Sequence, residues 1–176
     1  MQQKIQTGEF SRIFVMNSWS NPIPEVTRNI IVADALNHCI ESGELLVIGY
    51  LIKNQCVFLI GFSRNINIEE TLNNFFRQVA FEIEAYYQRK NTYGNYKIAD
   101  SLKTGSYAYI FTPYPFTDDY IKSIIMGREV NLPYYDPRLA RLEDYLHNDN
   151  FCSALDYAGG KSPVLVAVKR KNQRIS

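Results

Sequence analysis

Few residues of this chain have the types and spacing that catalysis or metal binding requires. The two histidines, His38 and His147, lie far apart in the sequence, and surface or capping roles suit them best. The three cysteines are odd in number and show no Cys-x-x-Cys spacing: they are Cys39, Cys56 and Cys152. This pattern argues against a disulfide framework and against a zinc knuckle. It favours reduced thiols in a cytoplasmic protein.

Tyrosine is the abundant side chain with a possible binding use, since the chain has 13 of them in 176 residues. A tyrosine ring stacks on bases or packs in protein interfaces, and it serves equally well in an ordinary core or surface. The net charge of +1 provides no field that would draw the whole molecule to nucleic acid. Nucleic-acid binding would therefore need a local basic patch.

Hydrophobic patterning predicts the elements of the first half. Ser11–Trp19 is rich in strand-forming residues. Apolar residues recur at helical spacing over Glu25–Glu41, and Ser42-Gly43 is a typical helix stop. Two almost continuous apolar runs, Leu45–Ile52 and Cys56–Phe62, are typical of strands that are covered on both faces.

The second half begins with a long helix that Asn67 can cap, with Glu70 placed as in a capping box. The elements expected after it are a strand at Ser106–Phe116, a short helix at Tyr120–Met126 capped by Thr117-Asp118, a helix at Pro137–His147 and a strand at Val164–Val168.

This order of elements is β-α-β-β-α-β with a tail. It predicts an α+β protein of the ferredoxin-like class, with an antiparallel sheet and its helices on one face. We expect residues 9–128 to form this domain, and residues 129–176 to form a C-terminal helical and strand extension packed on it. No apolar run approaches the length of a membrane span, so we expect a soluble protein without membrane contact.

Four stretches carry a resemblance to a known family: RIFVMNSW, IIVADALNHCIESGELLVIGYLIKNQCVFLIG, INIEETLNNFFRQVAFEIEAYYQRKN and KTGSYAYIFTPYPFTDDYIKSII. In pattern and order they resemble the REP-associated tyrosine transposases of the single-tyrosine HUH transposase family. The likeness runs from about Gly8 to Gly127, roughly two thirds of the chain. It implies a fold built for DNA cleavage and strand transfer.

The chemistry that the resemblance implies depends on a metal. Two histidines at positions i and i+2 of one strand would hold Mg²⁺ or Mn²⁺, with a third polar ligand from a helix. A tyrosine on that helix would attack the DNA phosphate and form a 5′-phosphotyrosine. In the alignment on YLIKNQCVFLIG, the histidine positions fall on Cys56 and Phe58. Phenylalanine binds no metal and a thiol is too soft for these ions, so we expect no metal cofactor.

The position of the nucleophilic tyrosine has two alternatives. The preferred alignment places it near Ile125 or Met126, so that Tyr120 comes more than a helical turn too early. A second alignment matches DYLHNDN with the end of the family's tyrosine-bearing helix and makes Tyr145 the counterpart, but it distorts the spacing from the preceding strand. Neither alignment restores the histidine pair.

We therefore expect a catalytically inactive relative that binds structured single-stranded DNA, such as a hairpin end, without cleaving it. Lysine and arginine would contact phosphates, and tyrosine would stack on bases. The candidate DNA-binding residues are Arg12, Arg64, Lys90, Lys103, Lys169, Arg170 and Lys171.

Two alternatives belong to other classes of protein. The small net charge favours a protein-interaction or structural module, and the family's tendency to dimerise would make it a homodimer. An active DNA-nicking and joining enzyme with unrecognised metal ligands is the third hypothesis. A covalent DNA adduct through Tyr120 or Tyr145 would identify such an enzyme.

Overall fold

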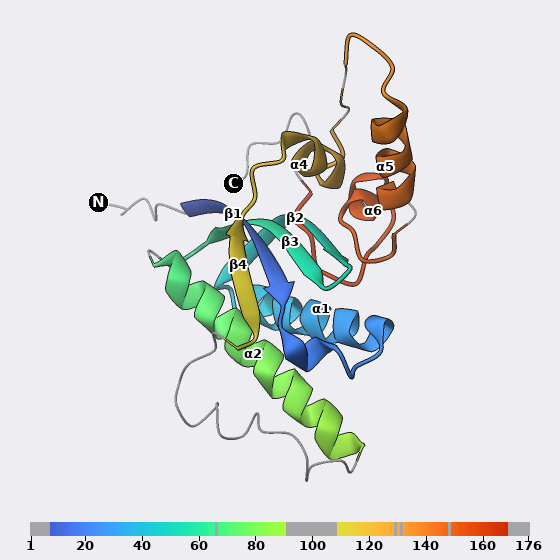
Figure 1. Ribbon diagram of the computed structural model, residues 1–176. Coiled ribbons are helices and arrows are strands. Elements are labelled where there is room, and N and C mark those ends of the chain that lie inside the picture. The colour runs from blue at the N-terminus through green and yellow to red at the C-terminus, as the bar shows by residue number, and fades with distance from the viewer. Residues whose placement is uncertain are drawn as a thin grey trace, which may run out of the picture.

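A computed structural model describes residues 8–65, 67–90, 109–128, 130, 132–147 and 149–168 (Figure 1). The strands in this part are β1 (Gly8–Met16), β2 (Leu45–Lys53), β3 (Cys56–Ser63) and β4 (Phe111–Pro115). The helices are η1 (Ser18–Ser20, a 3-10 turn), α1 (Glu25–Glu41), α2 (Ile68–Arg89), α4 (Asp119–Ile125), α5 (Pro137–His147) and α6 (Ala154–Tyr157). The predicted DNA-binding residues Lys103, Lys169, Arg170 and Lys171 lie outside the described residues.

The helix starts follow local capping chemistry. Asp118 caps α4 as predicted, because its carboxylate accepts hydrogen bonds from the backbone N–H groups of Tyr120 (3.0 Å) and Ile121 (3.1 Å). Asn67 caps α2 by accepting from the Glu69 N–H at 3.1 Å. The predicted capping box is not formed, because the Glu70 carboxylate instead accepts a hydrogen bond from the Asn65 side chain at 3.0 Å.

The four strands form one antiparallel sheet in the order β2-β3-β1-β4. The protein is thus a mixed α+β structure. Helix α1 joins β1 to β2, and β3 lies between these two strands. Helix α2 joins β3 to β4, and β1 lies between those two. Two split β-α-β units therefore interlock through the central strands β1 and β3.

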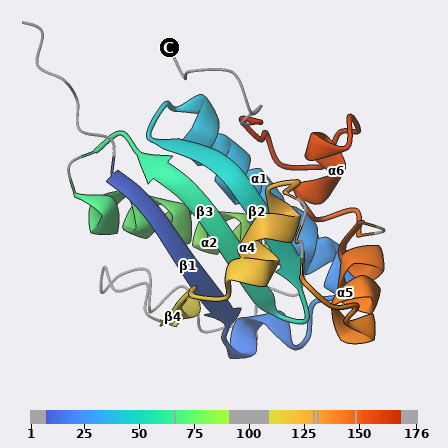
Figure 2. The same ribbon diagram turned by 90° about the horizontal axis from the view of Figure 1, so that it is seen from above.

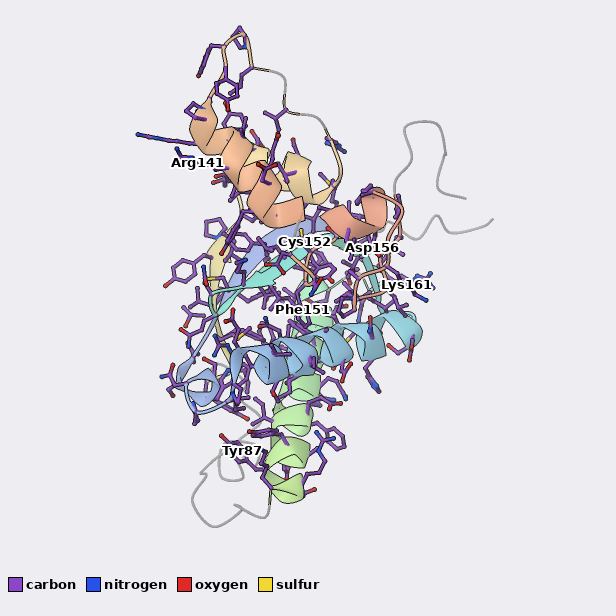
Figure 3. The ribbon with its side chains drawn as sticks, turned by 90° about the vertical axis from the view of Figure 1, so that its right-hand side faces the viewer. Tyr87, Arg141, Phe151, Cys152, Asp156 and Lys161 are labelled. Atoms are coloured by element: carbon purple, nitrogen blue, oxygen red, sulfur yellow. The ribbon has the colours of Figure 1, made fainter. Side chains whose placement is uncertain are left out.

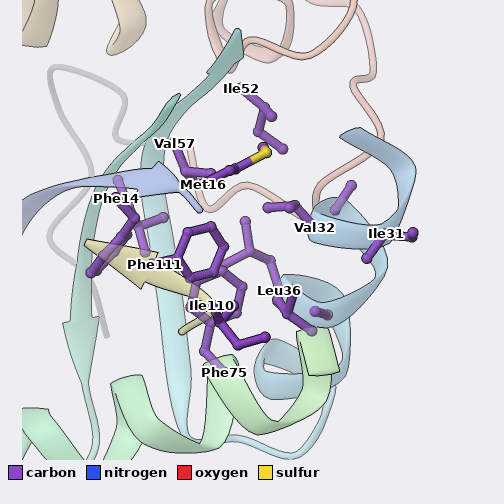
Figure 4. Close-up of a cluster of buried hydrophobic side chains, with 14 of the residues drawn as sticks. Phe14, Met16, Ile31, Val32, Leu36, Ile52, Val57, Phe75, Ile110 and Phe111 are labelled. Carbon is purple, nitrogen blue, oxygen red and sulfur yellow. The ribbon is translucent and has the colours of Figure 1, made fainter. Parts of the chain in front are cut away.

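Each face of the sheet is covered by its own apolar layer (Figures 1 and 2). Helices α1 and α2 cover one face, where the rings of Phe14, Phe75 and Phe111 meet with centroids 5.6–6.1 Å apart (Figure 4). Helix α4 crosses the other face, and α5 packs beside it (Figure 2). We call this second side the α4 face.

A β-bulge in β2 decides which side chains reach the α4 face. The pairing shifts between Val47 and Gly49, so the alternation of buried side chains restarts at Tyr50. As a result Ile48 and Leu51 pack on the α4 face, whereas Tyr50 packs against α1 and α2. A Cβ atom at Gly49 would lie 3.1 Å from the Met126 Cγ, so the missing side chain allows α4 to approach the sheet.

The C-terminal segment covers the outer edge of β2. Ile52 donates to the Phe151 carbonyl (2.9 Å) and Ala167 donates to the Val47 carbonyl (2.8 Å). Figure 3 shows the segment from Phe151 to Lys161 on this side of the molecule, between α5 and α1.

The predicted strand at Val164–Val168 is wrong, since only one parallel bridge forms there, between Val47 and Val166. The reason is that the Asn37 side chain on α1 takes up two backbone groups of this segment. It donates to the Pro163 carbonyl and accepts from the Leu165 N–H, both at 2.8 Å.

Within the described ranges, no helix combines the length and the apolar character that crossing a membrane requires.

Candidate functional site

Cys56 and Phe58, the positions at which the resemblance implies a histidine pair, lie on the same face of β3. Their neighbours Val57 and Leu59 are buried in the core under α1 and α2, so Cys56 and Phe58 face the opposite way. That direction is the α4 face, where Phe58 packs with the helices. Helix α4, which follows β3 and β4 in the chain, thus packs on the same face of the sheet as these two side chains.

The strand register extends this position into a row of side chains across the sheet. The row runs through Thr112, Val15, Cys56 and Lys53, which are direct partners in successive strand pairs. It spans about 14 Å, three interstrand spacings. A second row lies beside it on the α4 face and contains Tyr114, Ile13, Phe58 and Leu51. We call the eight residues of these two rows the hairpin-end strip.

Phe58 fills its position by aromatic packing. Its ring meets that of Phe116 at 5.3 Å between centroids and an interplanar angle of 68°. Phe116 is buried between β4 and α4, and the Lys122 ammonium lies 5.5 Å from its centroid. The place that a metal-binding histidine would occupy is therefore part of the apolar layer.

The Cys56 thiol is poorly suited to metal binding or nucleophilic attack. Cys56 is half-buried, and loss of solvation raises the pKa of its thiol above the ordinary value. Burial raises the pKa of Cys39 and of Cys152 further, to about 11 in each case. All three sulfurs thus remain protonated thiols at neutral pH, which agrees with the absence of a reactive spacing in the sequence.

Lys53 ends the strip in a charged cluster with two residues of the C-terminal part. Its ammonium forms an ion pair with Asp149 (2.7 Å) and lies 3.4 Å from the centroid of the Tyr145 ring. Partial burial disfavours the charged ammonium, but the contacts with Asp149 and Tyr145 outweigh this effect and raise the pKa of Lys53. The second tyrosine alternative, Tyr145, is thereby brought beside the strand pair that carries Cys56.

The first tyrosine alternative, Tyr120, lies in the first turn of α4 and is 47% exposed. Ile121, Ile124 and Ile125 make the contacts of α4 with the sheet. At the position that the preferred alignment gives the nucleophile, Ile125 is completely buried and Met126 packs over Gly49. No hydroxyl group replaces the nucleophile there.

The described basic candidates for DNA binding do not form one patch. Arg12 lies half-buried on β1, on the side of α1 and α2. Arg64 precedes α2 and Lys90 follows it, and the 22-residue helix between them is about 33 Å long. The Lys90 ammonium lies 5.5 Å from the Tyr86 ring centroid.

A hollow of about 370 Å³ opens between α5 and the segment that leads into it. Tyr134 and Tyr135 stand at this hollow, with 65% and 80% of their surfaces exposed. Its other lining residues are Val130, Leu132, Pro133, Asp136, Leu139, Ala140 and Glu143.

Several of these residues are absent from the sequence-based predictions. The two-residue Asn54-Gln55 turn fixes the pairing of the two strands and could have placed Lys53 beside Cys56. No local signal in the sequence indicates that Asp149 and Tyr145 pack on Lys53, because that contact joins residues about a hundred positions apart.

Among the residues that the structure describes, no three His, Cys, Asp or Glu side chains converge as a metal site would need. The chain matches no protein-family model, no curated protein and no solved structure in the comparisons made.

Proposed function

We propose that the chain is a catalytically inactive relative of the REP-associated tyrosine transposases that binds a structured single-stranded DNA end at the hairpin-end strip. The observation that carries this proposal is the placement of Cys56 and Phe58 on the face of the sheet that α4 and α5 cover. The implied chemistry requires the ligand strand and the tyrosine-bearing helix to share a face. In an α+β protein without this chemistry, nothing requires that strand and that helix to share a face.

The strand order supports the finer fold assignment within this proposal. Two split β-α-β units with the order β2-β3-β1-β4 are what a ferredoxin-like sheet requires. The helices that complete both units, α1 and α2, share one face of the sheet. The other face is then available for α4, α5 and a ligand.

The inactive character follows from what occupies the positions of the metal ligands. Phe58 offers no lone pair and packs on Phe116. The Cys56 thiol keeps its proton because its pKa is raised. Without a cation to polarise the scissile phosphate, a tyrosine near the strip would lack the partner that phosphoryl transfer requires.

Two exposed tyrosines, Tyr114 within the strip and Tyr145 beside it, provide surfaces on which bases can stack. Tyr114 on β4 is 51% exposed and Tyr145 on α5 is 49% exposed. The charge of Lys53 is compensated by Asp149, so stacking must contribute more than phosphate neutralisation. We therefore expect modest affinity and a shallow salt dependence.

A second candidate function is that of a protein-interaction module. The pairing of Lys53 with Asp149 favours it as well. An aromatic surface whose cation is already paired suits a protein partner as well as it suits bases. If this alternative is correct, the exposed tyrosines 114 and 145 would contact protein, and DNA would show no preference for the strip.

Fluorescence anisotropy with a labelled hairpin oligonucleotide distinguishes the two functions. We expect binding at low salt that Tyr114→Ala weakens about 5-fold or more. Tyr135→Ala is the control, because Tyr135 is also an exposed tyrosine, 80% against 51% for Tyr114, but lies at the hollow beside α5. Absence of binding at low salt, or equal loss in both variants, would contradict the proposal. A covalent adduct on a denaturing gel in the presence of Mn²⁺ would contradict the inactive assignment.

A further inference from the structure

The hollow beside α5 has a lining of one charge sign. Its ionisable carboxylates are Asp136 and Glu143, and none of the described residues that line it is a lysine or an arginine. One Asp136 oxygen caps α5 by accepting from the Arg138 N–H at 2.9 Å. Glu143 is half-buried and has no ion-pair partner among the described residues. Glu143 is thus a half-buried carboxylate in the hollow that none of the described cationic side chains neutralises.

The helix geometry keeps the nearby arginines away from the hollow. Leu139, Ala140 and Glu143 lie on one side of α5, since helical positions advance about 100° per residue. Arg138 and Arg141 therefore project from the other side of the helix. Figure 3 shows Arg141 extending away from the molecule. Neither arginine can form an ion pair with Glu143 unless the helical geometry of α5 changes.

The rim of the hollow adds two aromatic rings. Tyr134 and Tyr135 are exposed far beyond what a packed tyrosine shows, at 65% and 80%. The floor contains apolar side chains, among them Leu139 and Val130. The apolar floor, the aromatic rim and the Glu143 carboxylate together suit a ligand that carries a cationic group on an aliphatic chain. The volume of about 370 Å³ is at the small end for ligand sites and suits a single side chain.

We propose that this hollow binds an arginine side chain of a protein partner. A guanidinium can stack on a tyrosine ring and form two parallel hydrogen bonds to a carboxylate, whereas an ammonium forms only point contacts. Arginine and tyrosine are also the side chains that contribute most to protein interfaces. This inference does not depend on the DNA proposal, because the hollow and the hairpin-end strip share no residue.

The test is an NMR titration of the ¹⁵N-labelled full chain with a capped seven-residue peptide that carries one central arginine. We expect shifts confined to amides of residues 130–143, at peptide concentrations up to about 10 mM. A matched peptide with citrulline, which has the same shape without the charge, should bind at least 10-fold more weakly.

Variants of the chain assign the contact. Glu143→Gln should weaken peptide binding about 10-fold while the spectrum stays that of the folded protein. Tyr135→Ala should weaken it as well, through loss of the ring. Glu41→Gln, an exposed carboxylate at the end of α1, is the control and should have no effect. Equal binding of the citrulline peptide, unchanged binding by Glu143→Gln, or no shifts around the hollow would each overturn the proposal.

Discussion

The rings of Phe58 and Phe116 meet edge to face, with centroids 5.3 Å apart and an interplanar angle of 68°. This contact joins β3 to the segment that leads into α4. Phe58 stands where the resemblance implies a metal-binding histidine, and in the structure this position contributes packing energy. The inactive assignment therefore makes predictions about stability as well as about DNA chemistry.

A double-mutant cycle measures the packing between these rings. Phe116→Ala should lower the free energy of unfolding by about 3–5 kcal/mol, because the side chain is buried and leaves a cavity. Phe58→Ala should cost less because Phe58 is half-buried, and the two changes should couple by about 1 kcal/mol. Urea unfolding of the four proteins gives these values. Additive effects would show that Phe58 does not contribute through Phe116.

Gly127 and Gly159 form a matched pair that tests how the end of α4 packs. Both have positive φ angles, +66° and +92°. A Cβ at Gly127 would lie 2.4 Å from the Tyr157 Cβ, whereas nothing lies within 4 Å at Gly159. Gly159→Ala should therefore cost about 1 kcal/mol from backbone strain, and Gly127→Ala at least about 2 kcal/mol more from the clash. Equal unfolding free energies for the two variants would contradict this packing.

The cluster of Lys53 with Asp149 and Tyr145 predicts a stability difference that depends on pH. Lys53→Met should lower the unfolding free energy by about 1 kcal/mol at neutral pH, from the lost ion pair and ring contact. The pKa of Lys53 is raised on folding, so this contribution is fully present below the ordinary lysine pKa of 10.5. It is lost as the pH rises through the higher pKa of the folded state.

This pH dependence is tested by measuring the unfolding free energies of the wild type and Lys53→Met from pH 7 up to the highest pH at which both proteins still fold. Tyr145→Phe separates the contribution of the ring, because it keeps the ring under the ammonium and removes the hydroxyl group that also raises the pKa of Lys53. A stability difference that grows with pH would contradict the assignment.

The buried Ser153 attaches the C-terminal segment to the sheet. Its hydroxyl oxygen accepts from the Tyr50 N–H at 2.8 Å and also contacts the Ile125 carbonyl, which is on α4. Ser153→Ala should cost about 1–3 kcal/mol, because a buried N–H loses its partner. It should also accelerate hydrogen exchange of the Tyr50 amide.

Ser42→Ala is the control for Ser153→Ala. The exposed Ser42 hydroxyl donates to the Cys39 carbonyl at 2.9 Å, and its loss should change stability by less than about 0.5 kcal/mol. Similar costs for the two variants would contradict the structural role of Ser153.

Much of the fold could be predicted from the sequence because local patterns determine it. Apolar residues at helical spacing predicted α1 with its observed bounds, Glu25–Glu41, and Asp118 gave the start of α4 through its cap. Patterns that depend on distant partners were not predictable. The strand expected at Val164–Val168 fails because Asn37, far away in the sequence, takes up its backbone groups.

The candidate site was predictable only in part, for a similar reason. Alternation along β3 predicts that Cys56 and Phe58 share a face, and the structure agrees. The continuous apolar run of β2 concealed the bulge at Ile48, which turns Leu51 and Lys53 toward α4. The approach of Tyr145 to Lys53 depends on how α5 packs, and a sequence pattern does not encode that arrangement.

The central claim is that the hairpin-end strip binds a structured single-stranded DNA end, and mapping the contact by NMR tests it most directly. The ¹⁵N-labelled protein would be titrated with a hairpin oligonucleotide at low salt. We predict that the largest shifts fall on amides of Val15, Cys56, Thr112 and Tyr114, and that they decrease only slightly as salt is added. Shifts confined to other surfaces, or an unchanged spectrum at low salt, would contradict the account.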